Sequence, residues 1–330
     1  MTRIALDAMG GDYAPQIPIE GAVQALRTLP PTHDILLVGR SADVEAALSV
    51  HDVPEGRLHV VVAPDVIAMG EKPLQAIRGK RKSSIRVGLE MVKAGEADAF
   101  VSGGNTGAMM AGSTLVLGLH PAIDRPAIGT LFPTVGQPVL LLDAGANVDC
   151  TPRELRGFAR LGSVYAREAL RRPEPSVGLL NIGEEEEKGN ETARAAHTLL
   201  AEEPGLRFVG NVEGRDIING DCDVIVCDGF VGNVVLKFYE SVAKLFTGLL
   251  EQEVSAELLQ TPGMQRVFSI LDYAEYGGAP LLGVRGVSII CHGSSPARAI
   301  ANAIAVAAQS VDSHVSQHIA AELAEDGAVA

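Results

Sequence analysis

Six apolar segments of this sequence each run into a short glycine-containing loop that carries Asp, Asn, Ser, Lys or His side chains. The first is IALDAMGGDYAP, in which Asp7 and Asp12 flank the pair Gly10-Gly11. The six loops lie within residues 4–15, 102–108, 143–147, 181–190, 227–233 and 291–295. Turn and helix-capping chemistry explains one such loop. Because ligands bind beyond the carboxyl ends of parallel strands, six of them predict one shared active-site rim.

The composition of these loops predicts a site for a phosphate or carboxylate group. Glycines expose backbone N–H groups, and the helix N-termini that follow favour anions. The sequence has no GxxxxGK[ST], GxGxxG, GxSxG or HExxH motif, which disfavours P-loop, ordinary dinucleotide, hydrolase and zinc-protease chemistry. The rim therefore favours direct transfer to or from a phosphate-like group, without a covalent enzyme intermediate.

Three rim residues carry side chains that suit such a transfer. Lys188 follows four glutamates; a solvated charge run explains it, but the run directly follows an apolar strand end. Asn233 either caps the helix that follows it or points its amide at a developing oxyanion. His292 is either a hydrogen-bonded structural histidine or a site residue.

The segments between the loops are those of an α/β protein with parallel strands. Several strands are continuous apolar runs, as expected of strands buried on both faces. The expected strands are 4–6, 35–38, 59–62, 99–101, 139–142, 177–180, 207–209, 224–226 and 287–290. The expected helices include 17–26, 42–48, 84–94 and 153–170. This alternation predicts a three-layer α/β/α fold, which we treat as one catalytic unit over residues 1–330.

Residues 236–276 break the alternation, because they contain two amphipathic helical stretches and no strand signal. They predict a helical hairpin inserted between two βα units. Core packing or a dimer face explains its apolar positions, and docking on a membrane surface is the alternative. The apolar positions of its first helix are Phe238, Val242, Leu245, Phe246, Leu249 and Leu250.

A basic run stands out from an otherwise acidic protein. RGKRKSSIR contains Arg78, Lys80, Arg81, Lys82 and Arg86 within nine residues. The run is either an ordinary solvated face or a docking surface for an acidic partner or phosphate-bearing ligand.

Composition limits the class of protein. The formal net charge of −14 over 330 residues argues against a general nucleic-acid surface. Four cysteines without a CxxC or zinc spacing indicate buried thiols in a reducing cytoplasm. The first strand begins almost at once and no apolar run approaches the length of a membrane span, so we expect a cytosolic protein without a signal peptide.

Six motifs together resemble, in order, those of the bacterial PlsX family, the acyl-carrier-protein:phosphate acyltransferases. They are LDAMGGDYAP, SGGNTGAMMA, LLDAGAN, NIGEEEEKGN, DGFVGNVVLK and HGSSPARAI. The match runs from Ile4 to about Ile304, and the tail at 309–330 lies outside it and reads as a frayed helix. The resemblance implies a Rossmann-like α/β/α fold related to isocitrate dehydrogenase and phosphotransacetylase, and a homodimer.

The resemblance also implies a reaction and its residues. Inorganic phosphate attacks the thioester of a long-chain acyl carrier protein, giving acyl phosphate for phospholipid synthesis. Lys188 then supplies positive charge or a proton, and Asn233 donates to the oxyanion. Further contacts to phosphate and pantetheine would come from Asp12, Asn105, Thr106, Asn147, His292 and Ser294. No metal or other cofactor is expected.

The same resemblance implies two docking surfaces. The basic run would bind the acidic carrier protein. The hairpin would contact the membrane surface through Leu245, Phe246, Leu249 and Leu250, as expected of a cytoplasmic, peripherally membrane-associated enzyme. Two alternatives stay open: a phosphotransacetylase-like enzyme that uses acyl-coenzyme A, and a non-catalytic membrane-associated scaffold for lipid synthesis.

Overall fold

The computed structural model describes residues 1–53, 56–134 and 136–325, in two compact units. The first unit comprises Met1–Pro126, Glu168–Arg171 and Tyr276–Ala330, and the second Ala127–Arg167 and Arg172–Glu275. We expected a single catalytic unit over residues 1–330, and the structure divides into two compact units.

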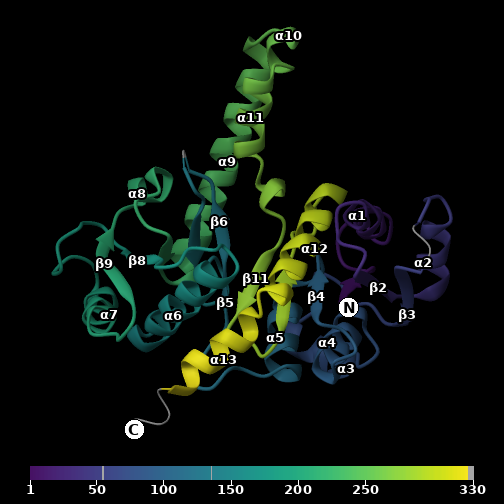
Figure 1. Ribbon diagram of the computed structural model, residues 1–330, viewed down its shortest axis with the longest axis horizontal. Coiled ribbons are helices and arrows are strands. Elements are labelled where there is room, and N and C mark those ends of the chain that lie inside the picture. The colour runs from purple at the N-terminus through teal and green to yellow at the C-terminus, as the bar shows by residue number, and fades with distance from the viewer. Residues whose placement is uncertain (54–55, 135, 326–330) are drawn as a thin grey trace. The chain divides into compact units, whose positions relative to one another are not determined.

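The first unit is built on a mainly parallel sheet (Figure 1). Its strands are β1 (Thr2–Asp7), β2 (His33–Gly39), β3 (Leu58–Val62), β4 (Ala99–Ser102), β11 (Ala279–Leu282) and β12 (Val287–Ile290). They lie in the order β3-β2-β1-β4-β12-β11, and only the β11–β12 pair among them is antiparallel. Its helices are α1 (Gln16–Leu26), α2 (Ser41–Leu48), α3 (Pro73–Gly79), α4 (Ser84–Ala94), α5 (Thr106–Val116), α12 (Ala297–Asp312) and α13 (Val315–Glu325).

Side-chain alternation along β4 places helices on both faces of this sheet. Ala99 and Val101 lie in a buried cluster with residues of α1 and α12. Phe100 points to the opposite face, where Gly88 of α4 leaves room for its ring: a Cβ at Gly88 would lie 2.1 Å from the ring. Successive strand residues point to opposite faces, so this unit has three layers, α/β/α.

The second unit has a smaller sheet in the order β6-β7-β10-β8-β9. The strands are β6 (Thr130–Phe132), β7 (Val139–Leu142), β8 (Ser176–Leu180), β9 (Arg207–Val212) and β10 (Val224–Val226), with β5 (Ala127–Ile128) preceding them in the chain. The helices are α6 (Pro152–Glu168), α7 (Glu191–Ala201), α8 (Gly214–Asn219), α9 (Gly229–Glu253), α10 (Ala256–Leu259) and α11 (Pro262–Leu271), followed by the short 3₁₀ helix η1 (Tyr273–Tyr276).

This second sheet also has helices on both faces. Leu141 and Ile225 lie in a buried cluster against which Tyr239 of α9 packs. On the other face, Gly162 lets α6 approach Val224 and Leu142. The strands β7, β10 and β8 are adjacent and parallel, so the loops that follow them meet at one edge.

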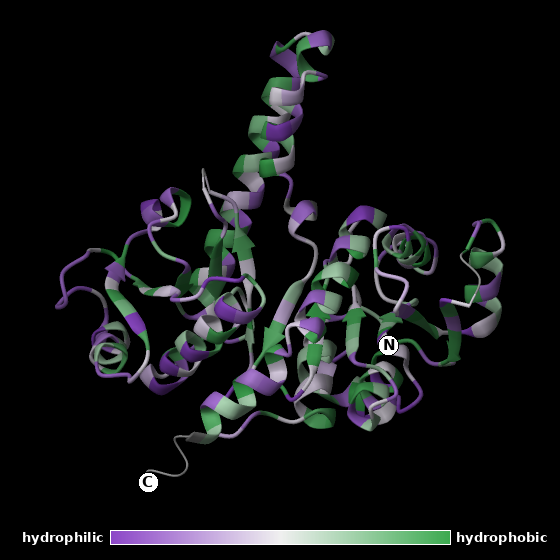
Figure 2. Cartoon of the chain, in the orientation of Figure 1, coloured by the Kyte–Doolittle hydropathy of each residue, from purple (hydrophilic) through white to green (hydrophobic). Residues whose placement is uncertain are grey.

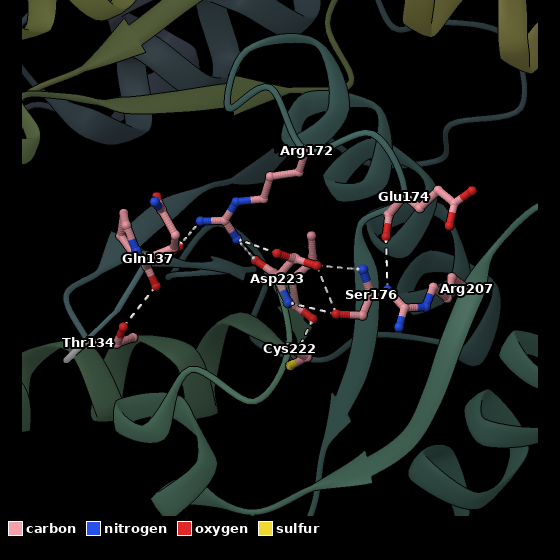
Figure 3. A network of polar contacts seen from close by, with 10 residues as sticks. Thr134, Gln137, Arg172, Glu174, Ser176, Arg207, Cys222 and Asp223 are labelled. Carbon is pink, nitrogen blue, oxygen red and sulfur yellow. Dashed lines mark hydrogen bonds and ion pairs between the residues drawn. The ribbon is translucent and has the colours of Figure 1, made fainter.

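A polar network joins the amino ends of these three strands (Figure 3). Arg172 donates to the carbonyl of Pro138 before β7 and to Asp223 Oδ1 before β10 (2.9 Å). Asp223 Oδ2 accepts from the backbone N–H and the hydroxyl of Ser176, the first residue of β8 (2.8 and 2.9 Å). The network lies at the edge opposite the polar loops, so its role is to hold the strands that carry them.

The expected inserted hairpin is present as helices α9 to α11, and α9 begins at Gly229 rather than near Leu236. The end of α9, with α10 and α11, extends away from the sheet of the second unit (Figure 1). Hydrophobic and hydrophilic residues alternate along it (Figure 2). Gly229, Gly232 and Ala243 are the buried residues of α9.

All nine expected strands are confirmed. The C-terminal tail differs from the expected frayed helix, because α12 continues to Asp312 and α13 follows it. Val315, Ile319 and Leu323 of α13 are buried at four-residue spacing, which fixes one face of that helix. Residues 326–330 of the expected tail lie outside the described residues.

Candidate active site

Asp143 organises the loop after β7. Its Oδ1 accepts the backbone N–H groups of Ile128, Gly145 and Ala146 at 2.9–3.1 Å. Its Oδ2 accepts the backbone N–H and the amide Nδ2 of Asn147 at 2.7 and 2.9 Å. Burial raises the pKa of Asp143, and these hydrogen bonds oppose the shift. The carboxyl group thus fixes the loop and occupies the amide nitrogen of Asn147, a predicted substrate contact.

The start of α9 lies against this loop because its glycines lack side chains. A Cβ at Gly229 would lie 2.7 Å from Asp143 Oδ2, and one at Gly232 would lie 1.9 Å from the Asp143 carbonyl oxygen. Asp228, not Asn233, caps the helix: its Oδ1 accepts the N–H of Val231 at 2.9 Å.

Asn233 is exposed, in the first turns of α9. It lies beside Gly145, where an added Cβ would meet Asn233 Oδ1 at 3.4 Å. The capping role considered for Asn233 is therefore wrong, since Asp228 fills it. The structure brings Asn233 next to the loop of Asn147, and its exposed amide is available to a ligand at the carboxyl edge.

Lys188 lies on the loop after β8, the strand next to β10. Its side chain is 46% exposed, and its ammonium lies 3.9 Å from Glu185 Oε2. Exposed glutamates surround it, and one of them, Glu184, is paired with Arg215. Lys188 therefore offers an accessible cation at the same edge of the sheet as Asn233.

In the first unit, Asp7 holds the ends of two neighbouring strands together. Its Oδ1 accepts the N–H of Met9 (3.0 Å), and its Oδ2 accepts the hydroxyl of Ser102 at the end of β4 (2.7 Å). Ser102 Oγ in turn accepts the N–H of Gly104 (3.0 Å). Burial raises the pKa of Asp7, and hydrogen bonds from Ser84 and Ser102 oppose the rise.

Glycines bring three loops of this unit into contact. A Cβ at Gly10 would lie 2.7 Å from the Gly104 nitrogen, and one at Gly103 would lie 3.3 Å from the His292 carbonyl oxygen. The N–H of Asp12 donates to the carbonyl of Gly293 at 2.8 Å. The loops after β1, β4 and β12 are thus in contact with one another.

Of the residues predicted on this rim, four are exposed: Asp12, Thr106, His292 and Ser294. Asn105 is buried. Its Oδ1 caps α5 through the N–H of Ala108 (2.9 Å), and its Nδ2 donates to three carbonyls of the 68–71 segment, with Met69 at 2.9 Å. The amide of Asn105 therefore holds the rim in shape, whereas the other four residues are exposed.

The basic run divides into two groups. Lys80 donates to Glu71 Oε1 (2.6 Å) and to the carbonyl of Val66, and Arg86 is paired with Glu90 (2.6 Å). Lys80 and Arg86 therefore have structural partners within the protein. Three members are exposed and could meet a partner: Arg78, Arg81 and Lys82.

Along the hairpin, the predicted membrane contacts are mostly exposed. Leu245, Phe246 and Leu249 are 60%, 53% and 45% exposed, and Leu250 is half-buried. In the described part of the chain, no helix has the length and apolar composition needed to cross a membrane.

Burial raises the pKa of all four cysteine thiols. Desolvation raises the pKa of the Cys222 and Cys291 thiols to about 12, and that of Cys227 well above its usual value. The partly buried Cys150 also has its pKa raised to about 12, mainly by desolvation. Residues 1–53, 56–134 and 136–325 contain no group of three His, Cys, Asp or Glu side chains arranged to hold a metal ion.

Comparison with known proteins identifies the family. The sequence matches the family model described as fatty acid synthesis protein over residues 2–318. It is 51% identical to a phosphate acyltransferase of Nostoc punctiforme over 326 residues, covering 96% of this chain and 95% of that protein. The chain belongs to the phosphate acyltransferase (PlsX) family. Another family member, from Desulforamulus reducens, is 51% identical over 336 residues and covers 100% of this chain and 99% of its own length.

Solved structures confirm the fold expected of a PlsX family member. EutD phosphotransacetylase from Staphylococcus aureus has a TM-score of 0.62 at 15% identity and covers 94% of both chains. A branched-chain phosphotransacylase from Enterococcus faecalis V583 has a TM-score of 0.60 at 14% identity, covering 94% of this chain and 99% of its own. At these identities the likeness shows the fold alone, a phosphotransacetylase-like α/β/α architecture.

The sequence predicted the loop 143–147 of this PlsX family member as part of the site, but Asp143 itself was not predicted to have a role. The signal was present: Asp7-Ala8 and Asp143-Ala144 each directly follow an apolar strand, with a glycine next but one after Ala8 and directly after Ala144. Both carboxyl groups are buried and accept backbone N–H groups of their own loops.

Proposed function

We propose that this protein transfers a long-chain fatty acyl group from the thioester of acyl carrier protein to inorganic phosphate. The products are acyl phosphate, a precursor for phospholipid synthesis, and the free carrier thiol. The family supports the reaction class, since relatives about half identical in sequence bear the name phosphate acyltransferase.

One observation carries the assignment of the reacting edge. Two adjacent parallel strands of the second unit, β10 and β8, each lead to one exposed donor: the amide of Asn233 in the first turns of α9 and the ammonium of Lys188 in the loop after β8. Asp143 and the glycines of α9 hold the backbone around Asn233. A fixed framework with two accessible donors suits a reaction that needs positioning and charge stabilisation rather than a covalent relay.

The proposed chemistry assigns one step to each donor. A phosphate oxygen attacks the thioester carbonyl carbon, and the carbonyl oxygen becomes an oxyanion that accepts a hydrogen bond from Asn233. The oxyanion then reforms the carbonyl group, the carbon–sulfur bond breaks and the thiolate leaves, which gives acyl phosphate. Lys188 offsets the negative charge of the approaching phosphate and gives a proton to the thiolate, whose conjugate acid has a pKa near 8.5 in free thiols. Solvent restores the proton on Lys188.

The remaining rim residues would bind phosphate and pantetheine. Asp12, Thr106, His292 and Ser294 are exposed on the rim of the first unit. Asn105 and Asn147 shape the rim, because their amide nitrogens are used by the protein itself. No metal or other cofactor takes part in this reaction scheme.

Three partners belong to the proposal. The exposed part of the basic run, Arg78, Arg81 and Lys82, would meet the acidic carrier protein. The exposed apolar residues of the hairpin would contact the membrane surface of a cytoplasmic, peripherally bound enzyme. A second copy of the chain would complete a homodimer.

The first experiment measures release of free carrier thiol from palmitoyl-carrier protein, with and without inorganic phosphate. Hydroxylamine in the same assay traps acyl phosphate as the hydroxamate. Phosphate-dependent thiol release with trapped product supports the proposal. Faster turnover of palmitoyl-coenzyme A than of the carrier thioester would support the coenzyme A alternative instead. No turnover with either donor, alongside intact vesicle binding, would point to the scaffold.

A further inference from the structure

We infer that Asn211 and Asn181 are positioning residues that hold the backbone of Lys188 while leaving its ammonium free to act. The inference rests on the proposed role of Lys188 and adds two residues to that site. Asn211 is on β9 and Asn181 follows β8, so two neighbouring strands each contribute an amide that hydrogen-bonds to the Lys188 loop.

The backbone of Lys188 is bonded on both sides. Its N–H donates to the carbonyl of Glu185 at 3.1 Å, closing a tight turn. Its own carbonyl accepts the Nδ2 of Asn181 at 3.1 Å. Asn181 is fixed in turn, because its Oδ1 accepts the N–H of Ile182 at 2.8 Å. Asn181, the first residue of the loop, is thereby tied to Lys188 near its far end.

Asn211, on the neighbouring strand β9, holds the same turn. Its Nδ2 donates to the carbonyl of Glu185 at 2.8 Å, the atom that also accepts from Lys188. The Oδ1 of Asn211 is buried and accepts no hydrogen bond from any described residue. A buried acceptor without a partner is unfavourable, so the orientation of this amide is set by the bond that Nδ2 makes to Glu185.

The side chain of Lys188 is guided separately from its backbone. A Cβ at Gly183 would lie 3.0 Å from Lys188 Cγ, so the aliphatic stem lies over this glycine. The side chain is 46% exposed, and its ammonium makes only a loose 3.9 Å pairing to Glu185. The loop therefore fixes the direction of the stem and leaves the charged end available. Misplacing a reacting group by about 1 Å can lower a rate on the order of 100-fold.

The decisive variant is Asn211→Leu in the full-length chain. Leucine has nearly the shape of asparagine, removes the orphan acceptor and leaves Glu185 its bond from Lys188, so the fold should tolerate it. We expect kcat for palmitoyl-carrier protein to fall about 10- to 100-fold, with the carrier KM within about twofold. Asn219→Leu, at an exposed asparagine of α8, is the matched control and should keep kcat.

A double-mutant cycle separates positioning from general structural damage. If Asn211 acts through Lys188, Asn211→Leu should change the residual kcat of Lys188→Ala less than about twofold. Gly183→Ala would place a Cβ 2.9 Å from Glu185 Oε2 and 3.0 Å from Lys188 Cγ, so it should displace both side chains and likewise lower kcat of the otherwise unchanged chain. An equal loss from Asn211→Leu in both backgrounds, or an unchanged kcat in the single variant, would overturn the inference.

Hydrogen exchange gives a readout that does not depend on turnover. The backbone amide of Lys188 should exchange more rapidly in Asn211→Leu than in the unchanged chain, and the Asn219→Leu control should match the latter. Equal exchange in all three would show that Asn211 does not hold the turn. If the unchanged chain showed no acyl-thioester turnover, the proposed function would be refuted. The hydrogen-exchange rates would still show whether Asn211 holds the turn at Lys188.

Discussion

Asp7 and Asp143 each follow a strand and accept hydrogen bonds from the loop that begins there, one in each unit of the chain. A loop that must present its backbone to a ligand cannot use that backbone in a sheet, so its N–H groups need another acceptor. Asp143 accepts five N–H contacts from four residues of its own surroundings, and Asp7 accepts from Met9, Ser84 and Ser102. The Asp143 carboxyl group thus takes the place of the missing strand partners, whereas Asp7 does so for Met9 and also accepts the hydroxyls of Ser84 and Ser102.

The two exposed donors of the second unit give the first prediction. Lys188→Ala and Asn233→Ala should each lower kcat by about 100-fold or more, since each removes a donor that acts on charge developing in the transition state. Thiol release with saturating phosphate and carrier thioester measures the effect. The control is Lys237→Ala, because the Lys237 ammonium is exposed, one turn beyond Asn233, and paired with Glu240 at 3.0 Å. Retained turnover in Lys188→Ala with an intact fold would remove Lys188 from the mechanism.

The cysteines give a second prediction. Desolvation raises the Cys222 and Cys291 pKa values from 9.0 to about 12, so the native chain holds these groups as thiols at neutral pH. Iodoacetamide at pH 7.5 should leave phosphate-dependent turnover unchanged but should label the unfolded chain. The stabilising effect is complete below pH 9 and is lost as pH rises from 9 toward 12, because the unfolded thiols ionise first. Stability that rises over that alkaline range would contradict the assignment.

At the scale of elements, the sequence predicted the parallel strands well and the short antiparallel ones not at all. Apolar runs such as 139–142 are buried on both faces and read directly as strands. β6 has three residues and lies next to Gly129 and Pro133, and β11 contains Pro280. Their strand structure comes from pairing with β7 and β12 rather than from local preference.

The same limit applies to the candidate site. The positions of the loops followed from where the strands end, which the sequence reveals. What each side chain does could not be predicted in this way. Asn105 and Asn233 both lie near a helix start, yet Asn105 caps its helix, whereas Asp228 and not Asn233 caps α9. Whether an amide is free for a ligand depends on backbone groups brought together by the fold, and sequence spacing does not record them.

The hairpin carries the third prediction. Leu245 and Phe246 of α9 are more than half exposed, so replacing both with Asp should remove apolar surface from a membrane contact and add charge. Binding to vesicles of phosphatidylethanolamine and phosphatidylglycerol should fall at least tenfold in a flotation assay. Val209→Asp, at an exposed position of β9, is the control and should bind normally. Unchanged binding of the double variant would place the membrane contact elsewhere or rule it out.

For the whole molecule, charge separates the two proposed docking surfaces. A net charge of −14 repels anionic lipid, so contact through the hairpin should depend on apolar area and persist at high salt. The carrier protein is acidic too, and its approach would have to be guided by a local basic surface against the overall field. Salt should therefore weaken carrier binding but not vesicle binding.

The basic surface tests this division directly. Arg78, Arg81 and Lys82 are exposed, whereas Lys80 and Arg86 are engaged with Glu71 and Glu90, so reversing the first three to Glu should spare the local fold. The carrier KM should rise about tenfold or more at low salt, because repulsion replaces attraction during encounter, while kcat changes little. Turnover of a short soluble thioester should be unaffected, and Arg27→Glu, at an exposed arginine after α1, is the matched control. If both thioesters lost activity alike, the surface would be part of the fold or the active site rather than the place where the carrier docks.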